Sequence, residues 1–195
     1  MTAVTPLQSV HKKGLFGEHY KKKESDLLNI TEVTDLTIVQ IAQYKNSKIN
    51  LNNLNIDGLK FPLQSSTVSS NQGTRILWSG PNTWLVVSKK ENIVKIISEN
   101  CSDENFAVTD ISHSRVIIKI KGLKANEVLK KGCPINFNEF KKNKCVGSVF
   151  NGINIVVDCV DEKIQTFDIL ALRSFGESLY HHITDAALEF GYNGI

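Results

Sequence analysis

The sequence has no long hydrophobic run and little cysteine, proline or methionine. Its 195 residues include four cysteines, four prolines and one methionine. No stretch of about 18 consecutive apolar residues occurs, so we expect no membrane-spanning helix and no membrane partner. The N-terminus lacks the apolar centre of a secretory signal, and its lysines follow the only mildly apolar part. These absences predict a cytoplasmic protein.

The four cysteines give no sign of a disulfide framework or a zinc site. Cys101, Cys133, Cys145 and Cys159 form no C-x-x-C pair, and no histidine lies at zinc-finger spacing from them. Cys145 and Cys159 fall in apolar runs, where a reduced thiol behaves as a small hydrophobic side chain. We therefore expect reduced cysteines, as in a cytosolic protein.

Charge of neither sign dominates the chain. Lys and Arg number 23 against 20 Asp and Glu, which gives a formal net charge of +3. A dedicated nucleic-acid-binding domain carries a far more basic face, so we expect no nucleic-acid partner. Hydrophobic residues make up 41% of the chain and charged residues 22%, so one sizeable core is expected.

Residues 1–30 show no clean periodicity and are rich in lysine. Lys12 and Lys13 precede the short GLFG segment, and Lys21, Lys22 and Lys23 follow it. Such lysines are typical either of an arm that docks on an acidic partner or of a solvated tail. The tail is favoured because this composition collects at chain ends. We predict an N-terminal arm, partly disordered, at 1–30 and a single α+β domain at 31–195.

Strand and helix patterns alternate irregularly along the rest of the chain. Asn151-Gly152 between apolar runs predicts a type I′ hairpin within 148–158. A short helix is expected around Leu51, Leu54 and Leu59. Other helices are predicted at 91–100 and 124–131, and strands at 36–44, at both ends of 75–88, and at 106–112, 115–122 and 166–172. The mixture predicts an α+β fold with mostly antiparallel sheets and packed helices.

The last helix is predicted to begin directly after Arg173. Ser174 and Glu177 have the S-x-x-E spacing of a capping box, and Gly191 is placed to end the helix. Apolar residues recur on one stripe of the helix, namely Phe175, Leu179, Ile183, Ala186, Ala187 and Phe190. We therefore expect this helix to pack on a sheet or on a partner.

Polar residues gather in the segment DISHSR, which contains Asp110, Ser112, His113 and Arg115. Ser112 and His113 are adjacent, so in an extended chain they point to opposite sides, and no G-x-S-x-G elbow is present. A nucleophilic serine is therefore disfavoured, and a polar turn or an interface role is preferred. A pair between Cys133 and His113 is a further hypothesis, although nothing in the sequence brings these residues together.

The last helix contains residues with the spacing of metal ligands. Glu177, His181 and Asp185 lie at i, i+4 and i+8, but they face away from the apolar stripe, so solvent is favoured over a metal. His182 lies at the edge of the stripe and is an interface candidate.

Trp78 and Trp84 are expected in core or edge packing, with Trp84 as an alternative interface anchor. No G-x-G-x-x-G or Walker A motif occurs, so no dinucleotide site is predicted.

Four segments together resemble the gamma subunit family of heterotetrameric sarcosine oxidase. They are ILWSGPNTWLVV (76–87), VTDISHSRVIIKIKG (108–122), VLKKGCPINF (128–137) and FDILALRSFGESLYHHITDAALEFG (167–191). The resemblance covers about residues 36–191, and the Lys-rich N-terminus matches no part of the family pattern. It implies a fold similar to the folate-binding domain of glycine-cleavage aminomethyltransferases. It also implies a complex that demethylates sarcosine oxidatively to glycine and passes the one-carbon unit to tetrahydrofolate.

The resemblance also implies where the chemistry of such a complex lies. FAD, FMN and NAD belong to the alpha and beta subunits, the tetrahydrofolate site to alpha, and zinc to delta. The gamma chain is then a structural subunit with no catalytic residue, cofactor or metal of its own. Its candidates for contact with the alpha, beta and delta subunits are Trp84, His113, Arg115, Arg173 and His182.

Two other functions compete with a structural subunit. The first is a standalone folate-binding protein of the aminomethyltransferase type, for which Asp110, His113 and Arg115 are the candidate cofactor-binding residues and Asp110 the candidate for the pterin. The second is an interaction module with unrelated partners. Co-purification followed by a sarcosine oxidation assay separates these hypotheses.

Overall fold

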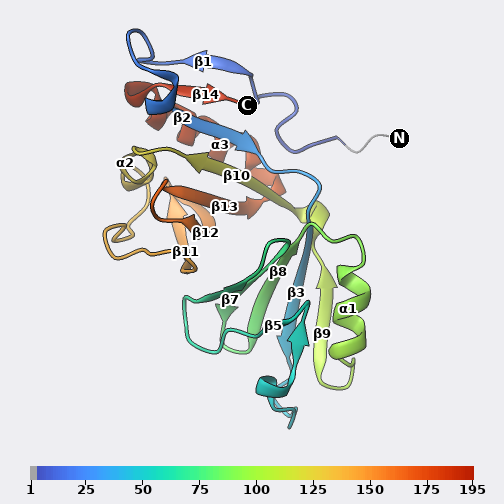
Figure 1. The fold of residues 1–195 in the computed structure, drawn as a ribbon. Helices are drawn as coiled ribbons and strands as arrows, with labels where there is room; N and C mark the ends of the chain where they lie inside the picture. The colour runs from blue at the N-terminus through green and yellow to red at the C-terminus, as the bar shows by residue number, and fades with distance from the viewer. Residues whose placement is uncertain (1–3) are drawn as a thin grey trace. The chain divides into compact units, whose positions relative to one another are not determined.

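The computed structural model describes residues 4–195 and divides the chain into two compact units (Figure 1). Unit 1 comprises residues up to 34 together with Ser114–Lys142 and Val146–Ile195. Unit 2 comprises Asp35–His113 and Asn143–Cys145. The sequence predicts one domain at 31–195, whereas the chain passes from unit 1 to unit 2 and back, and returns briefly to unit 2 at Asn143–Cys145 before it ends in unit 1. Each unit is an α+β structure with its own sheet and its own hydrophobic core.

Unit 1 is built on a mostly antiparallel sheet. The hairpin predicted at Asn151-Gly152 is confirmed, since both residues have positive φ, 46° and 85°. Seven strands follow one another in the order β1 (Gly14–Phe16), β14 (Tyr192–Gly194), β2 (Leu28–Glu32), β10 (Arg115–Lys121), β13 (Thr166–Leu172), β12 (Ile153–Asp161) and β11 (Cys145–Phe150). The pairing of β14 with β2 is parallel, whereas β10 pairs antiparallel with both β2 and β13.

The core of unit 1 lies between this sheet and two helices, α2 (Ala125–Lys130) and α3 (Gly176–Ala187). The strand predicted at 115–122 is confirmed as β10, and its residues Val116, Ile118 and Ile120 are buried in the same cluster as Leu179 and Ile183 of α3. Burial of each such side chain contributes about 1.5–3 kcal/mol before the entropy of ordering is counted. In the described part of the chain, no helix is both long and apolar enough to cross a membrane.

The predicted capping box of the last helix is wrong, and α3 ends at Ala187, four residues before the predicted terminator Gly191. Ser174 lies in a 3₁₀ turn, η4 (Arg173–Phe175), so α3 begins later, and its N-cap residue Phe175 makes no side-chain capping bond. Glu177 instead accepts a hydrogen bond from the Ser9 hydroxyl at 2.5 Å. Gly191 ends the short η5 turn (Leu188–Phe190) with a φ of 70°.

The N-terminal residues from position 4 onward form part of the structure of unit 1. Strand β1 pairs antiparallel with β14 from the other end of the chain, and Phe16 stacks on Tyr192 at 5.1 Å between ring centroids. Leu7 is fully buried in the core. This organisation differs from the arm expected at 1–30. The reason is that pairing between opposite ends of the chain leaves no local periodicity in the sequence.

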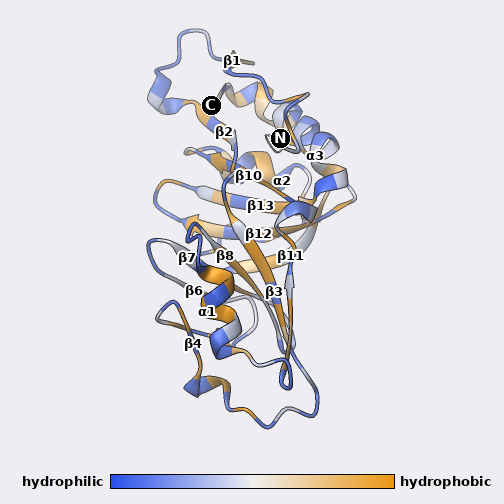
Figure 2. Ribbon diagram, turned by 90° about the vertical axis from the view of Figure 1, so that its right-hand side faces the viewer, coloured by the Kyte–Doolittle hydropathy of each residue, from blue (hydrophilic) through white to orange (hydrophobic). Residues whose placement is uncertain are grey.

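Unit 2 contains a five-stranded antiparallel sheet and one α-helix. Helix α1 (Ile93–Asn100) buries Ile93 and Ile97 and has apolar and polar residues along its length (Figure 2). The strands predicted at 36–44, 75–88 and 106–112 are all confirmed. The sheet order is β6 (Val68–Ser70), β7 (Thr74–Gly80), β8 (Thr83–Ser88), β3 (Thr37–Gln43) and β9 (Phe106–Asp110).

The short helix expected around residues 51–59 is wrong beyond its first turn. Leu51–Asn53 forms a single 3₁₀ turn, η2, and a two-stranded ribbon follows, β4 (Asn55–Ile56) and β5 (Leu59–Lys60). Asp57 and Gly58 connect the two strands with φ values of 54° and 74°. The Asp-Gly pair is a hairpin signal that was masked by the spacing of the leucines.

Candidate interaction surface

The segment DISHSR forms a polar turn, as the sequence predicts. Strand β9 ends at Asp110, a 3₁₀ turn η3 (Ser112–Ser114) follows, and β10 begins at Arg115. The Asp110 carboxylate accepts hydrogen bonds from the Ser112 hydroxyl at 2.5 Å and the Ser112 backbone N–H at 2.9 Å. The Ser112 hydroxyl oxygen in turn accepts a hydrogen bond from Ile38 N–H at 2.9 Å. The hydrogen bonds of the Ser112 hydroxyl therefore stabilise this turn, and Ser112 does not have the arrangement of a nucleophilic serine.

The charge of Asp110 is stabilised by the same turn. The hydrogen bonds from the Ser112 hydroxyl and backbone, in that order, lower the pKa of Asp110, and the nearby His113 contributes in the same direction. Both Asp110 and His113 are exposed. Asp110 is thus an ionised carboxylate already engaged in local bonds, which is a different environment from the buried acid that would bind a pterin.

Arg115 is the member of this segment whose bonding is incomplete. It is half-buried, and its Nε has no hydrogen-bond acceptor among the described residues. Burial lowers the pKa of the Arg115 guanidinium. An unpaired buried donor costs about 1–3 kcal/mol, and more when the group is charged. Arg115 therefore keeps a buried donor for which the described residues supply no acceptor.

Apolar side chains lie on the strand beside Arg115 and in the turn that follows. Leu172 is the register partner of Arg115 across β10 and β13, and it is 42% exposed. Phe175, which the helix stripe predicts to be buried, is 47% exposed. Between them, Arg173 donates from its guanidinium to the carbonyl of Val4 at 2.5 Å. We call Arg115, Leu172, Arg173 and Phe175 the arginine surface. No pattern in the sequence predicts that its two apolar residues, Leu172 and Phe175, are exposed.

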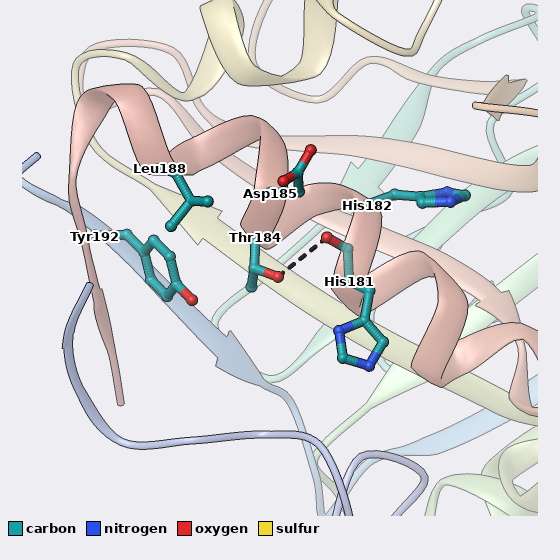
Figure 3. A pocket seen from close by; sticks show the side chains of 6 residues that line it. All are labelled: His181, His182, Thr184, Asp185, Leu188 and Tyr192. Carbon is teal, nitrogen blue, oxygen red and sulfur yellow. Dashed lines mark hydrogen bonds between the residues drawn. The ribbon is translucent and has the colours of Figure 1, made fainter. Parts of the chain in front are cut away.

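A shallow open groove of about 450 Å³ follows the outer side of α3 (Figure 3). Its lining residues are His181, His182, Thr184, Asp185, Leu188 and Tyr192. Thr184 donates its hydroxyl back into the helix, to the carbonyls of Tyr180 at 2.8 Å and His181 at 3.1 Å. His182 points away from His181 and Tyr192, and its Nδ1 is buried without a partner among the described residues. The groove thus has few polar groups that converge on one point.

The spacing of Glu177, His181 and Asp185 does not assemble a metal site in the described part of the chain. All three residues are exposed, as predicted for the solvent side of α3. Across residues 4–195, no group of three or more His, Cys, Asp or Glu side chains is arranged to hold a metal ion. Glu177 is instead bonded to Ser9.

Trp84 belongs to the core of unit 2, which corrects its assignment as an interface anchor. It is 1% exposed and packs edge-on against Phe61 at 4.8 Å between ring centroids. Its indole N–H donates to the carbonyl of Pro62 at 2.8 Å. Trp78, opposite Trp84 in the hairpin, is half-buried at the edge of the same cluster.

All four cysteines are buried, and Cys101 and Cys133 are free thiols. Burial raises the pKa of Cys101 to about 11, so its thiol is neutral at physiological pH. Cys133 lies in unit 1 with its sulfur 3.4 Å from the Ser148 hydroxyl, whereas His113 lies in unit 2. The pKa of Cys133 is also raised by burial. These environments are those of structural cysteines and not of nucleophiles.

The fold places the chain in a known class of α+β proteins. The glycine cleavage system aminomethyltransferase T from Bartonella henselae superposes with a TM-score of 0.59 at 11% identity, over 82% of this chain and 46% of that one. A chain of the heterotetrameric sarcosine oxidase from Corynebacterium sp. U-96, in complex with pyrrole 2-carboxylate, superposes with a TM-score of 0.83 at 22% identity, over 97% of both chains. These similarities establish the aminomethyltransferase-like fold.

The family is established by sequence. Residues 51–189 match the model of the "Sarcosine oxidase, gamma subunit family", and the chain belongs to this family. It is similar to sarcosine oxidase subunit gamma from Corynebacterium sp. strain U-96, with 28% identity over 137 residues. It is also similar to the same subunit from strain P-1, with 29% identity over 138 residues. Each match covers 68% of this chain and 66% of the relative, slightly under two thirds of its length.

Proposed function

We propose that this chain is the non-catalytic structural subunit of a heterotetrameric sarcosine oxidase. In this role it supports a complex that demethylates sarcosine oxidatively to glycine and transfers the one-carbon unit to tetrahydrofolate. The observation that carries the proposal is the match of residues 51–189 to the gamma subunit family. The contribution of the chain is then to present surfaces on which the catalytic subunits assemble.

The arginine surface supports an assembly role for unit 1. A half-buried guanidinium with an unpaired Nε, next to exposed Leu172 and Phe175, is a common composition of protein interfaces, where Arg and aromatic residues are enriched. We assign Arg115 and Arg173 to contacts with a partner subunit, with an acceptor such as a carboxylate facing Arg115. His113 and His182, which are polar and at least partly exposed, are proposed as further contacts.

The proposal places the partners and cofactors outside this chain. The partners are alpha, beta and delta subunits, and they hold FAD, FMN, NAD, tetrahydrofolate and zinc. We also propose a cytoplasmic location. The buried free thiols of Cys101 and Cys133 support it, because reducing compartments keep such cysteines in the thiol form.

Co-expression with the alpha, beta and delta subunits of the same organism tests the proposal. The tagged chain is expected to co-purify with them at fixed stoichiometry, and the purified assembly is expected to oxidise sarcosine. The assembly prepared without this chain should lose thermal stability or subunits. A chain that fails to co-purify, or that oxidises sarcosine alone, contradicts the proposal.

A second candidate function is a standalone folate-binding protein, which the aminomethyltransferase-like fold favours. Its candidate residues remain Asp110, His113 and Arg115. Calorimetric titration of the isolated chain with tetrahydrofolate distinguishes the two functions. The structural role predicts no tight binding, whereas micromolar or tighter binding that is lost in Asp110→Asn favours the alternative.

A further inference from the structure

The positive charge of the chain is concentrated near its N-terminus. Residues 11–23 contain five lysines and one glutamate, a net charge of +4, whereas the whole chain has a net charge of +3. The remaining charged residues therefore sum to −1. Glu24 and Asp26 border this group at the short η1 turn (Glu24–Asp26). The group lies before residues 51–189, which are the part matched by the family model.

The structure holds these lysines on an ordered scaffold. Strand β1 pairs with β14, and the loop after it is fixed on the end of α3 by a hydrogen bond from Glu18 N–H to the Leu188 carbonyl at 2.7 Å. Gly17 approaches Leu188 so closely that a Cβ there would lie 2.2 Å from the Leu188 carbonyl oxygen. The five lysine side chains therefore project from a defined backbone.

Apolar side chains are exposed within the same basic segment. Tyr20 is 81% exposed, with the Lys21 ammonium 5.6 Å from its ring centroid, and Leu15 is 48% exposed. Lys12, Lys13, Lys21 and Lys23 are also exposed. We call these four lysines with Leu15 and Tyr20 the basic N-terminal surface. Exposed aromatic residues are enriched at contact surfaces, so Tyr20 is the residue of this segment that points to a contact.

The position of β1 in the sheet indicates the kind of partner. It is the first strand in the order of the seven-stranded sheet and pairs there only with β14, so one of its edges faces no other strand of the described chain (Figure 1). An extended peptide can pair with such an edge through backbone hydrogen bonds, which neither a nucleic acid nor a lipid surface provides. A peptide with acidic side chains would also face the lysines.

We propose that the basic N-terminal surface docks an acidic, extended segment of a partner subunit. This inference rests on the proposed function, because it takes the partner from the same sarcosine oxidase assembly. The acidic segment lies along β1, with its carboxylates near Lys12, Lys13, Lys21 and Lys23 and its apolar groups on Leu15 and Tyr20. Lys22 is left out because its ammonium is bonded to the Phe190 carbonyl at 3.1 Å.

Charge reversal tests this docking surface in the co-expressed assembly. We expect Lys13→Glu/Lys23→Glu to raise the dissociation constant for the partner subunits about tenfold or more at 0.1 M salt, with a smaller difference at 0.5 M salt. The matched control is Lys141→Glu/Lys142→Glu, which reverses two exposed lysines of the same unit and should leave the dissociation constant unchanged. Circular dichroism of each isolated chain verifies that the variants are folded.

A second measurement does not depend on substitutions. Hydrogen exchange is expected to show amide protection within residues 12–23 when the wild-type chain enters the assembly. If this segment gains no protection and both double variants assemble like the wild type, docking is overturned while the structural-subunit role stands. If the wild-type chain does not assemble with these subunits, both proposals are overturned.

Two other roles of the lysines have distinct outcomes. Lysines beside an edge strand can simply prevent pairing between copies of a protein. Self-association of Lys13→Glu/Lys23→Glu on gel filtration, with unchanged assembly, would assign the surface to that role and overturn docking. Binding of the wild-type chain to phosphatidylserine vesicles or single-stranded RNA, lost in this variant while assembly is unchanged, would overturn it in favour of an anionic ligand.

Discussion

At the scale of single residues, burial separates side chains that the sequence presents as equivalent. Trp84 and Arg115 are both residue types favoured at interfaces. Trp84 is almost completely buried and donates to Pro62, so the core satisfies its polar atom. Arg115 keeps an Nε without an acceptor in the described chain. Residue type alone therefore does not identify an interface anchor, whereas the state of its hydrogen bonds does.

Arg115→Met should separate an interface role from a structural one. Because Nε is unpaired in the isolated chain, replacing the guanidinium by an apolar side chain should raise the free energy of unfolding, by about 1–3 kcal/mol. In the co-expressed assembly, the same substitution should raise the dissociation constant about tenfold or more, because a partner acceptor loses its donor. Urea unfolding and subunit dissociation measure the two effects.

The control for Arg115 is Lys121→Met, at the exposed far end of the same strand. It removes one positive charge from β10 without an unpaired buried donor, so both measurements should stay close to those of the wild type. A large loss of stability in isolated Arg115→Met, with unchanged assembly, would show that Arg115 serves the fold of unit 1.

At the scale of elements, local signals predict the hairpins and most strands. Asn151-Gly152 specifies its turn through two positive φ angles, which few other residue pairs adopt. Asp57-Gly58 has the same backbone geometry, yet the three nearby leucines suggest a helix instead. A residue pair that readily adopts two positive φ angles thus predicts the local structure better than the spacing of a few apolar residues in an Asn-rich segment.

The two ends of the last helix should respond differently to mutation. Ser174→Ala should change the free energy of unfolding by less than about 0.5 kcal/mol, because Ser174 caps no helix, whereas loss of a true cap costs about 1 kcal/mol. Gly191→Ala should cost more than about 1 kcal/mol, because Gly191 has a φ of 70° and its added Cβ would lie 2.7 Å from the Glu18 carbonyl oxygen.

Thermal or urea unfolding of the two alanine variants measures this difference. The prediction is that Gly191→Ala loses more free energy of unfolding than Ser174→Ala. The two variants can be compared directly, since both replace a small residue near the same helix by alanine. A Ser174→Ala loss equal to or larger than the Gly191→Ala loss would restore the capping box that the spacing of Ser174 and Glu177 suggests.

At the scale of the whole molecule, acidic pH should destabilise the chain through bonded carboxylates. Burial alone would raise the pKa of Asp57, but hydrogen bonds from Lys90, Asn71 and Thr74 outweigh it, and the pKa is lowered from 3.8. A lowered pKa in the folded state means that the stabilisation is present above the unfolded pKa. It is lost as the pH falls below about 3.8 and through the folded pKa.

Asp57→Asn isolates this contribution from that of the other carboxylates. The variant should be less stable than the wild type by about 1–2 kcal/mol at pH 7, because it loses a charge-assisted bond to Lys90. The difference should shrink as the pH falls from 5 to 2, since Asp57 of the wild type becomes protonated. Urea unfolding at several pH values measures it, and a difference that is constant with pH would contradict the prediction.

Also at this scale, the division of the chain depends on contacts between distant segments. Strand β2 near the N-terminus, β10 in the middle and β14 at the C-terminus share one sheet, with Asp35–His113 inserted between two of them. Residues 4–30, expected as an arm, contribute two strands and the buried Leu7 to that sheet and its core. Their exposed lysines are thereby held on an ordered surface.

The sequence by itself determined the α+β class, most strands, the Asn-Gly hairpin, the buried thiols and, through four motifs, the family. These properties depend on residues close together in the chain, where periodicity and turn chemistry act locally. Only the tertiary structure decided that Trp84 is core, that Arg115 has an unpaired donor and that the N-terminus pairs with the C-terminal strand. Burial and hydrogen bonding of these residues depend on partners far away in the sequence, which local patterns do not specify.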